Sequence, residues 1–147
     1  MRYDDAKNYL ESLKSLSQET LNLADEIDQL RALTISCTVS TDKDCVQSNG
    51  EMDKMSAIIG VIIELEKRVD AIKKIYWQRR KIVSKFLFTY EDEKTRDFIE
   101  NRYIREKSIY VVSAMMDMSE SNARRLQKKV IVDFGEYYDT IKDKIKG

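Results

Sequence analysis

Two long rows of mostly apolar residues, spaced alternately by three and four positions, constrain the fold of this chain more than any other feature. The members of the first row are Leu13, Leu16, Thr20, Leu23, Ile27 and Leu30. The members of the second row are Ile58, Ile62, Leu65, Val69, Ile72 and Tyr76. This spacing is that of a left-handed coiled coil, and the chain has no proline to interrupt a helix. We therefore expect two long helices, over about 4–33 and 51–88.

The segment between these rows, residues 34–50, reads TISCTVSTDKDCVQSNG. Its serine, threonine, aspartate and asparagine side chains compete with the helix for backbone hydrogen bonds, so the segment is predicted to be a loop. The simplest arrangement folds the first helix back on the second as an antiparallel hairpin. Because each row is equally complementary to itself, a homodimer through the N-terminal helices stays open as an alternative.

After Tyr90 the pattern changes to short elements. The run Glu91-Asp92-Glu93 favours a helix start, and Ser108 and Ser119 are good N-caps for two further helices, to Met116 and to Ile145. The predicted fold class is thus all-α. Residues 1–88 are expected to form the hairpin, with its loop at 34–50, and residues 89–147 a helix-turn-helix domain.

The spacing of apolar residues in VVSAMMDMSESNARRLQKKV is that of a helix-turn-helix. We expect Ser113 and Ala114 to supply the small residues where the two helices touch, and Tyr76 and Trp77 to join the hairpin to this domain as core residues. Residues 119–129 hold four basic side chains and one acid, a net charge of +3. Such a face suits the base edges and phosphates of double-stranded DNA. The predicted DNA-binding residues are Ser119, Ser121, Asn122, Arg124, Arg125, Lys128 and Lys129.

A second basic stretch has two interpretations. Residues 73–85 contain six lysines and arginines and no acid. They can lie along a DNA backbone, or they can pair with acids of the first helix. The pairing interpretation is favoured because residues 1–50 hold nine acidic and five basic side chains.

Composition argues against several other classes of protein. The chain has no histidine and only two cysteines, Cys37 and Cys45, which excludes histidine-based catalysis, mixed cysteine-histidine zinc sites and a four-thiolate metal site within one chain. It has no glycine-rich phosphate loop, so we expect no enzyme activity, no cofactor and no metal. No apolar run is long enough for a membrane span or a signal sequence. We expect a cytoplasmic protein with reduced thiols.

The segment DEKTRDFIENRYIREKSIYVVSAMMDMSESNARRLQKKV resembles the region-4-like helix-turn-helix of sigma-70-type factors and of small phage transcriptional regulators. In that pattern a short helix ends in an Arg-Tyr pair, here Arg102-Tyr103, before two serine-capped helices. Upstream, DCVQSNGEMDKMSAIIGVIIELEKRV resembles an uncharacterised family of phage and prophage proteins from Gram-positive bacteria. The similarity covers about residues 30–135. This chain departs from the pattern at Asp117, where glycine is usual, and at Ser113, where alanine is usual.

The resemblance implies a phage-encoded transcriptional regulator, akin to the RinA and ArpU types, that binds DNA and possesses no catalytic activity. It makes RNA polymerase a candidate partner of the N-terminal helices. Two other functions are consistent with the sequence. One is a DNA-packaging protein like the small subunit of terminase, which would form a ring-sized oligomer. The other is a helical protein-interaction module that does not bind DNA.

Overall fold

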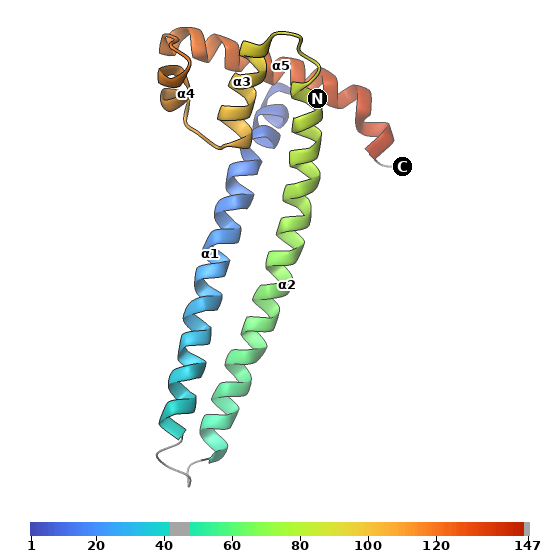
Figure 1. Ribbon diagram of the computed structural model, residues 1–147. Coiled ribbons are helices and arrows are strands. Elements are labelled where there is room, and N and C mark those ends of the chain that lie inside the picture. Colours follow the sequence, from blue (N-terminus) through green and yellow to red (C-terminus); the bar gives the residue numbers. More distant parts are fainter. Residues whose placement is uncertain (42–47, 146–147) are drawn as a thin grey trace. The chain divides into compact units, whose positions relative to one another are not determined.

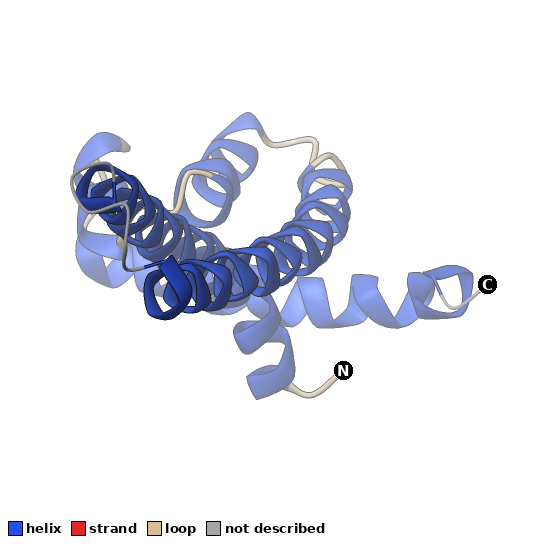
Figure 2. Ribbon diagram, turned by 90° about the horizontal axis from the view of Figure 1, so that it is seen from below, coloured by secondary structure: helices blue, strands red, loops and turns tan. Residues whose placement is uncertain are grey.

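The computed structural model describes residues 1–41 and 48–145, and within these ranges it contains helices and no strand (Figures 1 and 2). The elements in chain order are α1 (Tyr3–Thr41), α2 (Ser48–Leu87), α3 (Glu93–Ile99), the π-helical turn η1 (Glu100–Ile104), α4 (Ile109–Met115) and α5 (Glu120–Ile145). The all-α prediction is thus confirmed for the described residues.

The chain divides into two compact units whose boundaries fall inside the two long helices. Unit 1 comprises Met1–Ser15 and Tyr76–Gly147, and unit 2 comprises Leu16–Ile75. The sequence predicted a single boundary near residue 88. The start of α1 and the end of α2 therefore share a unit with the C-terminal helices.

Unit 2 is an antiparallel pair of helices folded back within one chain. Its buried core consists of Leu23, Ile27, Ile62, Val69 and Ile72, and Leu16, Leu30, Ile58 and Leu65 pack against it. These residues are members of the two predicted rows, so both rows are confirmed as the packing seam. Exposed ion pairs join the two helices, Arg31 with Glu66 and Arg68 with Glu19. Exposed pairs of this kind add little stability, and the apolar seam holds the unit together.

The predicted loop at 34–50 is wrong over most of its length, because α1 continues to Thr41 and α2 begins at Ser48. The hydroxyl of Thr34 donates to the carbonyl of Leu30, at 3.0 Å, which lets a threonine stay within a helix instead of ending it. Residues 42–47, and with them the prediction for Cys45, lie outside the described residues. The side chain of Cys37 is also outside them.

Unit 1 has one continuous apolar core to which α1, α2, α3, η1, α4 and α5 all contribute. Its buried residues are Ala6, Leu10, Leu13, Val83, Phe86, Leu87, Phe98, Ile99, Tyr103, Ile109, Val112, Ala123, Val130, Ile131 and Phe134. The ring of Phe134 lies 5.1 Å from that of Tyr9 and 5.2 Å from that of Phe86, which ties α5 to both long helices. Gly135 allows the chain start to come close, because a Cβ at this position would lie 3.3 Å from the carbonyl oxygen of Met1.

Local capping fixes where α3, α4 and α5 begin. Asp92 accepts a hydrogen bond from the amide of Lys94 at 3.2 Å and another from the hydroxyl of Thr95 at 2.7 Å. The predicted caps Ser108 and Ser119 are confirmed: their hydroxyls accept from the amides of Val111 at 3.3 Å and Asn122 at 3.1 Å. Each cap satisfies amide groups that a helix start leaves unpaired.

Candidate nucleic-acid interface

The helices α4 and α5 are joined by a four-residue turn whose geometry is defined by backbone contacts. The amide of Met118 donates to the carbonyl of Ser113 at 2.9 Å, and Asp117 adopts a left-handed conformation, with φ of 56°. Glycine adopts this conformation without strain, whereas aspartate tolerates it. Asp117 therefore adopts the left-handed conformation that glycine takes most easily.

The contact between α4 and α5 is built largely as the sequence predicts. Val112 and Ala123 are fully buried, and Met116 and Leu126 pack against the same core. Ser113 is buried, and its hydroxyl donates to the carbonyl of Tyr110 at 2.8 Å. The prediction for Ala114 is wrong, because this residue is exposed. The small residues at the contact are Ser113 on α4 and Ala123 on α5.

All seven predicted DNA-binding residues lie on the surface of unit 1, on the turn and the first three turns of α5. At 3.6 residues per turn, Ser121, Arg125 and Lys128 share one stripe. Asn122 and Lys129 lie on its flank, away from α4. Ser119 is occupied as the helix cap. No ion pair or side-chain hydrogen bond involves Arg125, Lys128 or Lys129 anywhere in the described ranges. Their charged groups are thus available to a ligand.

Arg124 is the exception, because its guanidinium is already engaged. Its Nη2 atom lies 2.9 Å from Oε1 of Glu120 and 3.3 Å from the hydroxyl of Tyr110, and the group sits 5.7 Å from the centre of the tyrosine ring. The hydrogen bond with Glu120 raises the pKa of Arg124 above its usual value. Tyr110 and Glu120 were missing from the predicted site. The pair Glu120 and Arg124, four positions apart on one helix, was the available signal.

Among the described residues, the second basic stretch does not pair with acids. None of its six charged residues takes part in an ion pair with another described residue. Instead, Arg79 donates to the hydroxyl of Ser12 at 2.7 Å and lies over the ring of Tyr9. Arg80 lies over the ring of Trp77, 5.1 Å from its centre. The favoured interpretation, pairing across the hairpin, is therefore wrong, because aromatic and hydroxyl groups of unit 1 hold these two arginines.

Tyr76 and Trp77 were both predicted to be core residues, and the prediction is confirmed for Tyr76 alone. Tyr76 packs against the core of unit 1. Trp77 is 59% exposed, so its prediction is wrong. One residue further along a helix turns a side chain by about 100°, which carries Trp77 away from the seam that Tyr76 completes.

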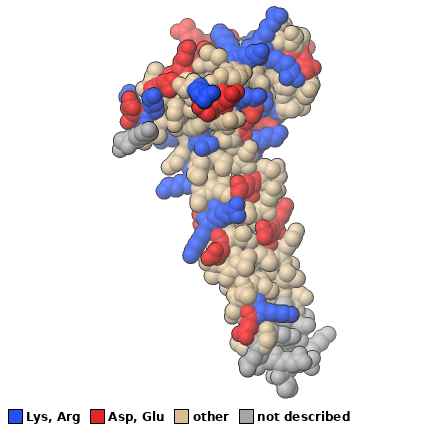
Figure 3. Space-filling model, turned by 180° about the vertical axis from the view of Figure 1, so that it is seen from behind, with Lys and Arg blue, Asp and Glu red and all other residues tan. Residues whose placement is uncertain are grey.

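The visible surface does not carry one large patch of a single charge (Figure 3). On the face shown in Figure 3, basic and acidic side chains are interspersed. The net charge of +3 over residues 119–129 is therefore a feature of one helix segment. Within the described residues no group of three or more potential ligands could hold a metal ion, and none of the helices there is long and apolar enough to cross a membrane.

Comparison with known proteins found no relative. No family model, no curated protein and no solved structure matches this chain. The interpretation of the site therefore depends on its own geometry and charge.

Proposed function

We propose that this protein is a non-enzymatic DNA-binding transcriptional regulator that inserts the N-terminal half of α5 into the major groove. The observation that carries this proposal is the exposed stripe of Ser121, Arg125 and Lys128, which lies opposite the buried residues Ala123 and Val130. A helix supported on one side and basic on the other has the width and charge that the major groove accepts.

The contacts divide by position along α5. Arg125, in the second turn, is placed to reach a guanine edge with two hydrogen bonds. Lys128 and Lys129, one turn further on, are placed to contact phosphates, which set affinity and register without reading sequence. The resemblance to phage regulators of the RinA and ArpU types agrees with this assignment. The two apolar rows pack against each other within one chain, so a dimer through another face of the N-terminal helices would be needed to present two such helices to two half-sites.

Fluorescence anisotropy with labelled duplex DNA across a salt series tests the proposal. We expect binding that weakens steeply as salt rises. The variant Arg125→Ala/Lys128→Ala should bind at least about tenfold more weakly, and its salt slope should fall by about one for each phosphate that the variant no longer neutralises. Lys142→Ala/Lys144→Ala is the matched control, because it removes two charges from exposed positions at the far end of the same helix.

Two results would contradict the proposal. One is the absence of binding to any duplex at low salt, and the other is equal weakening by the two double variants. The first would favour a protein-interaction module. One observation supports that alternative: α4 exposes Tyr110, Val111 and Met115, an apolar face beside the basic stripe. Exposed apolar faces of this kind mark protein contacts.

A further inference from the structure

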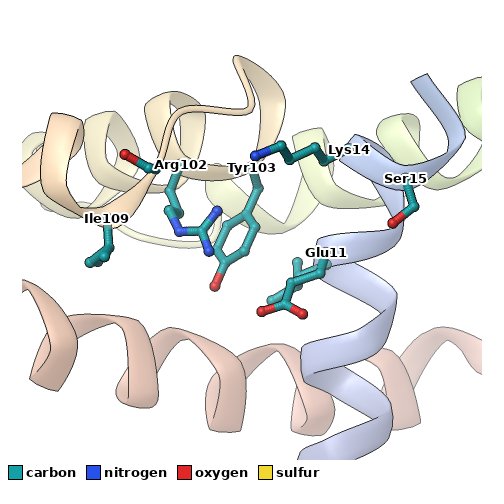
Figure 4. A pocket seen from close by; sticks show the side chains of 8 residues that line it. Glu11, Lys14, Ser15, Arg102, Tyr103 and Ile109 are labelled. Carbon is teal, nitrogen blue, oxygen red and sulfur yellow. The ribbon is translucent and has the colours of Figure 1, made fainter. Parts of the chain in front are cut away.

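A cleft of about 350 Å³ opens within unit 1, and the basic stripe of α5 contributes no residue to its lining. Figure 4 shows how side chains of α1, η1 and the start of α4 converge on it. The lining residues are Leu10, Glu11, Lys14, Ser15, Arg102, Tyr103, Ser108 and Ile109. Leu10 and Ile109 are buried and form an apolar wall, whereas the other six bring polar groups to the opening. None of the seven predicted DNA-binding residues belongs to this set.

Tyr103 is a buried residue whose hydroxyl faces the cleft (Figure 4). The residue is only 3% exposed, yet no described side chain or backbone group forms a hydrogen bond with its hydroxyl. In Figure 4 this hydroxyl points into the opening, near Glu11. Burial raises the pKa of Tyr103 well above its usual value, and Arg102 opposes the rise. The phenol is therefore neutral at pH 7 and free to donate. The hydroxyl oxygen itself keeps contact with solvent at the opening, so an acceptor in the cleft can reach it (Figure 4).

Arg102 is held in place beside this hydroxyl. Its Nε atom donates to Oε1 of Gln127 at 2.9 Å, and Nη1 donates to the carbonyl of Lys107 at 3.4 Å. Its guanidinium lies over the ring of Tyr103, 5.1 Å from the centre. These contacts leave Nη2 with no partner among the described residues. An arginine whose side chain is already held on one edge can bind a carboxylate or phosphate through its other edge, and little side-chain entropy is lost on binding.

Two further charges set the preference of the cleft. Lys14, on the exposed side of α1, extends toward the opening (Figure 4) and forms no ion pair with any residue that the structure describes. Glu11 brings a carboxylate to the same opening, which disfavours an anion. The two cations and one acid leave a net charge of +1, which suits a single negatively charged group.

We propose that this cleft binds an oxyanion, a phosphate or carboxylate group, through Arg102, Tyr103 and Lys14. The oxygen atoms of the anion accept from the free Nη2 edge, from the phenol and from the ammonium group, and Glu11 limits the affinity. A free small anion and a backbone phosphate of a nucleic acid offer the same chemistry. The site does not depend on DNA binding by α5.

Titration of the full-length protein with inorganic phosphate, followed by NMR, tests this assignment. Sodium chloride keeps the ionic strength constant, so that screening does not change. We expect saturable shifts of the Arg102 Nε–H signal and of the Ser108 and Ile109 amides. Tyr103→Phe and Arg102→Gln should each weaken binding about fivefold or more, the effect of removing a hydrogen bond to a charged group. Glu11→Gln should tighten binding, a change that a purely structural role would not produce.

Arg105→Gln is the matched control. Arg105 follows η1 and is exposed, and it does not line the cleft. Shifts that rise linearly without saturating would overturn the proposal, as would equal weakening by Arg102→Gln and Arg105→Gln. If Arg102→Gln fails to fold, Tyr103→Phe and Glu11→Gln still decide the matter, because they predict opposite changes.

The source of the oxyanion is distinguished in a second measurement. If phosphate competes with labelled duplex at constant ionic strength, and Tyr103→Phe weakens duplex binding, the cleft holds a backbone phosphate. If Tyr103→Phe abolishes phosphate binding but leaves duplex binding unchanged, the cleft holds a free small anion. A protein that binds phosphate and no duplex would keep this proposal and end the proposed function.

Discussion

Replacing Leu10 with alanine should destabilise helix α5, which is distant in the sequence but shares a core with Leu10. Leu10 is 1% exposed and belongs to the same buried core as Val130 and Phe134, more than a hundred positions along the chain. Truncation of a buried leucine to alanine costs about 2–5 kcal/mol, the forfeited transfer energy plus the cavity. Against a total stability of order 5–15 kcal/mol, this is a large fraction.

Two measurements convert that cost into an observable. With a urea m-value of about 1.5 kcal/mol/M, a loss of about 3 kcal/mol lowers the unfolding midpoint by about 2 M. Amide exchange at Val130 and Phe134 should accelerate about a hundredfold where it proceeds through global unfolding. Leu21→Ala is the control, because Leu21 lies on the same helix and is 59% exposed, and it should change stability by less than about 0.5 kcal/mol.

The reasoning would be refuted if Leu10→Ala left exchange in α5 unchanged. The N-terminal turns of α1 would then contribute nothing to the fold around α5. Confirmation would mean that residues 89–147 alone, the predicted domain, lack part of their core.

Three further predictions concern a cap, a titration and the arginine beside α4. Ser119→Ala should cost about 1 kcal/mol in urea unfolding through removal of the α5 cap, and Ser121→Ala, an exposed position two residues on, should cost much less. Burial raises the pKa of Tyr9 to about 12, and Tyr138 adds to the rise. In the unfolded chain the phenol titrates near pH ~10. The contribution of Tyr9 to the free energy of unfolding should therefore be complete below that pH and decline from about pH 10 to 12. A melting temperature that stays constant over this interval would contradict the assignment, and Tyr9→Phe should reduce the decline. Glu120→Gln should free Arg124 and tighten duplex binding several-fold, more than Glu136→Gln does on the same helix; equal effects would mean that added charge alone is responsible.

The sequence predicted what depends on periodicity and on single local contacts. The two apolar rows, the caps Ser108 and Ser119 and the buried face of α4 and α5 all follow from spacing and from short-range hydrogen bonding. Each of these signals lies within a few residues of the structure it determines. For the same reason the exposed position of the seven predicted site residues was accessible from the sequence.

What the sequence did not predict depends on contacts between distant segments or on competition between local ones. Thr34 has an intrinsic preference for loops, yet its bond to the carbonyl of Leu30 keeps it in a helix. Arg79 meets Ser12 and Tyr9 instead of an acid, which only the packing of α2 on α1 within unit 1 decides. The cleft likewise combines residues from three segments, and no spacing along the chain connects Glu11 with Arg102 and Ser108.

The π turn η1 has a consequence for the comparison of sequences. Here the amide of Arg105 donates to the carbonyl of Glu100, five positions back, at 2.8 Å. An α-helix uses four positions for the same step, so this turn accommodates one additional residue. A relative with an uninterrupted α-helix would have one residue fewer between Phe98 and Ser108, and an ungapped alignment would match Arg102 and Tyr103 to the wrong positions. Deleting one residue from this turn should therefore restore an uninterrupted α-helix and keep the residues that follow it in their present orientation.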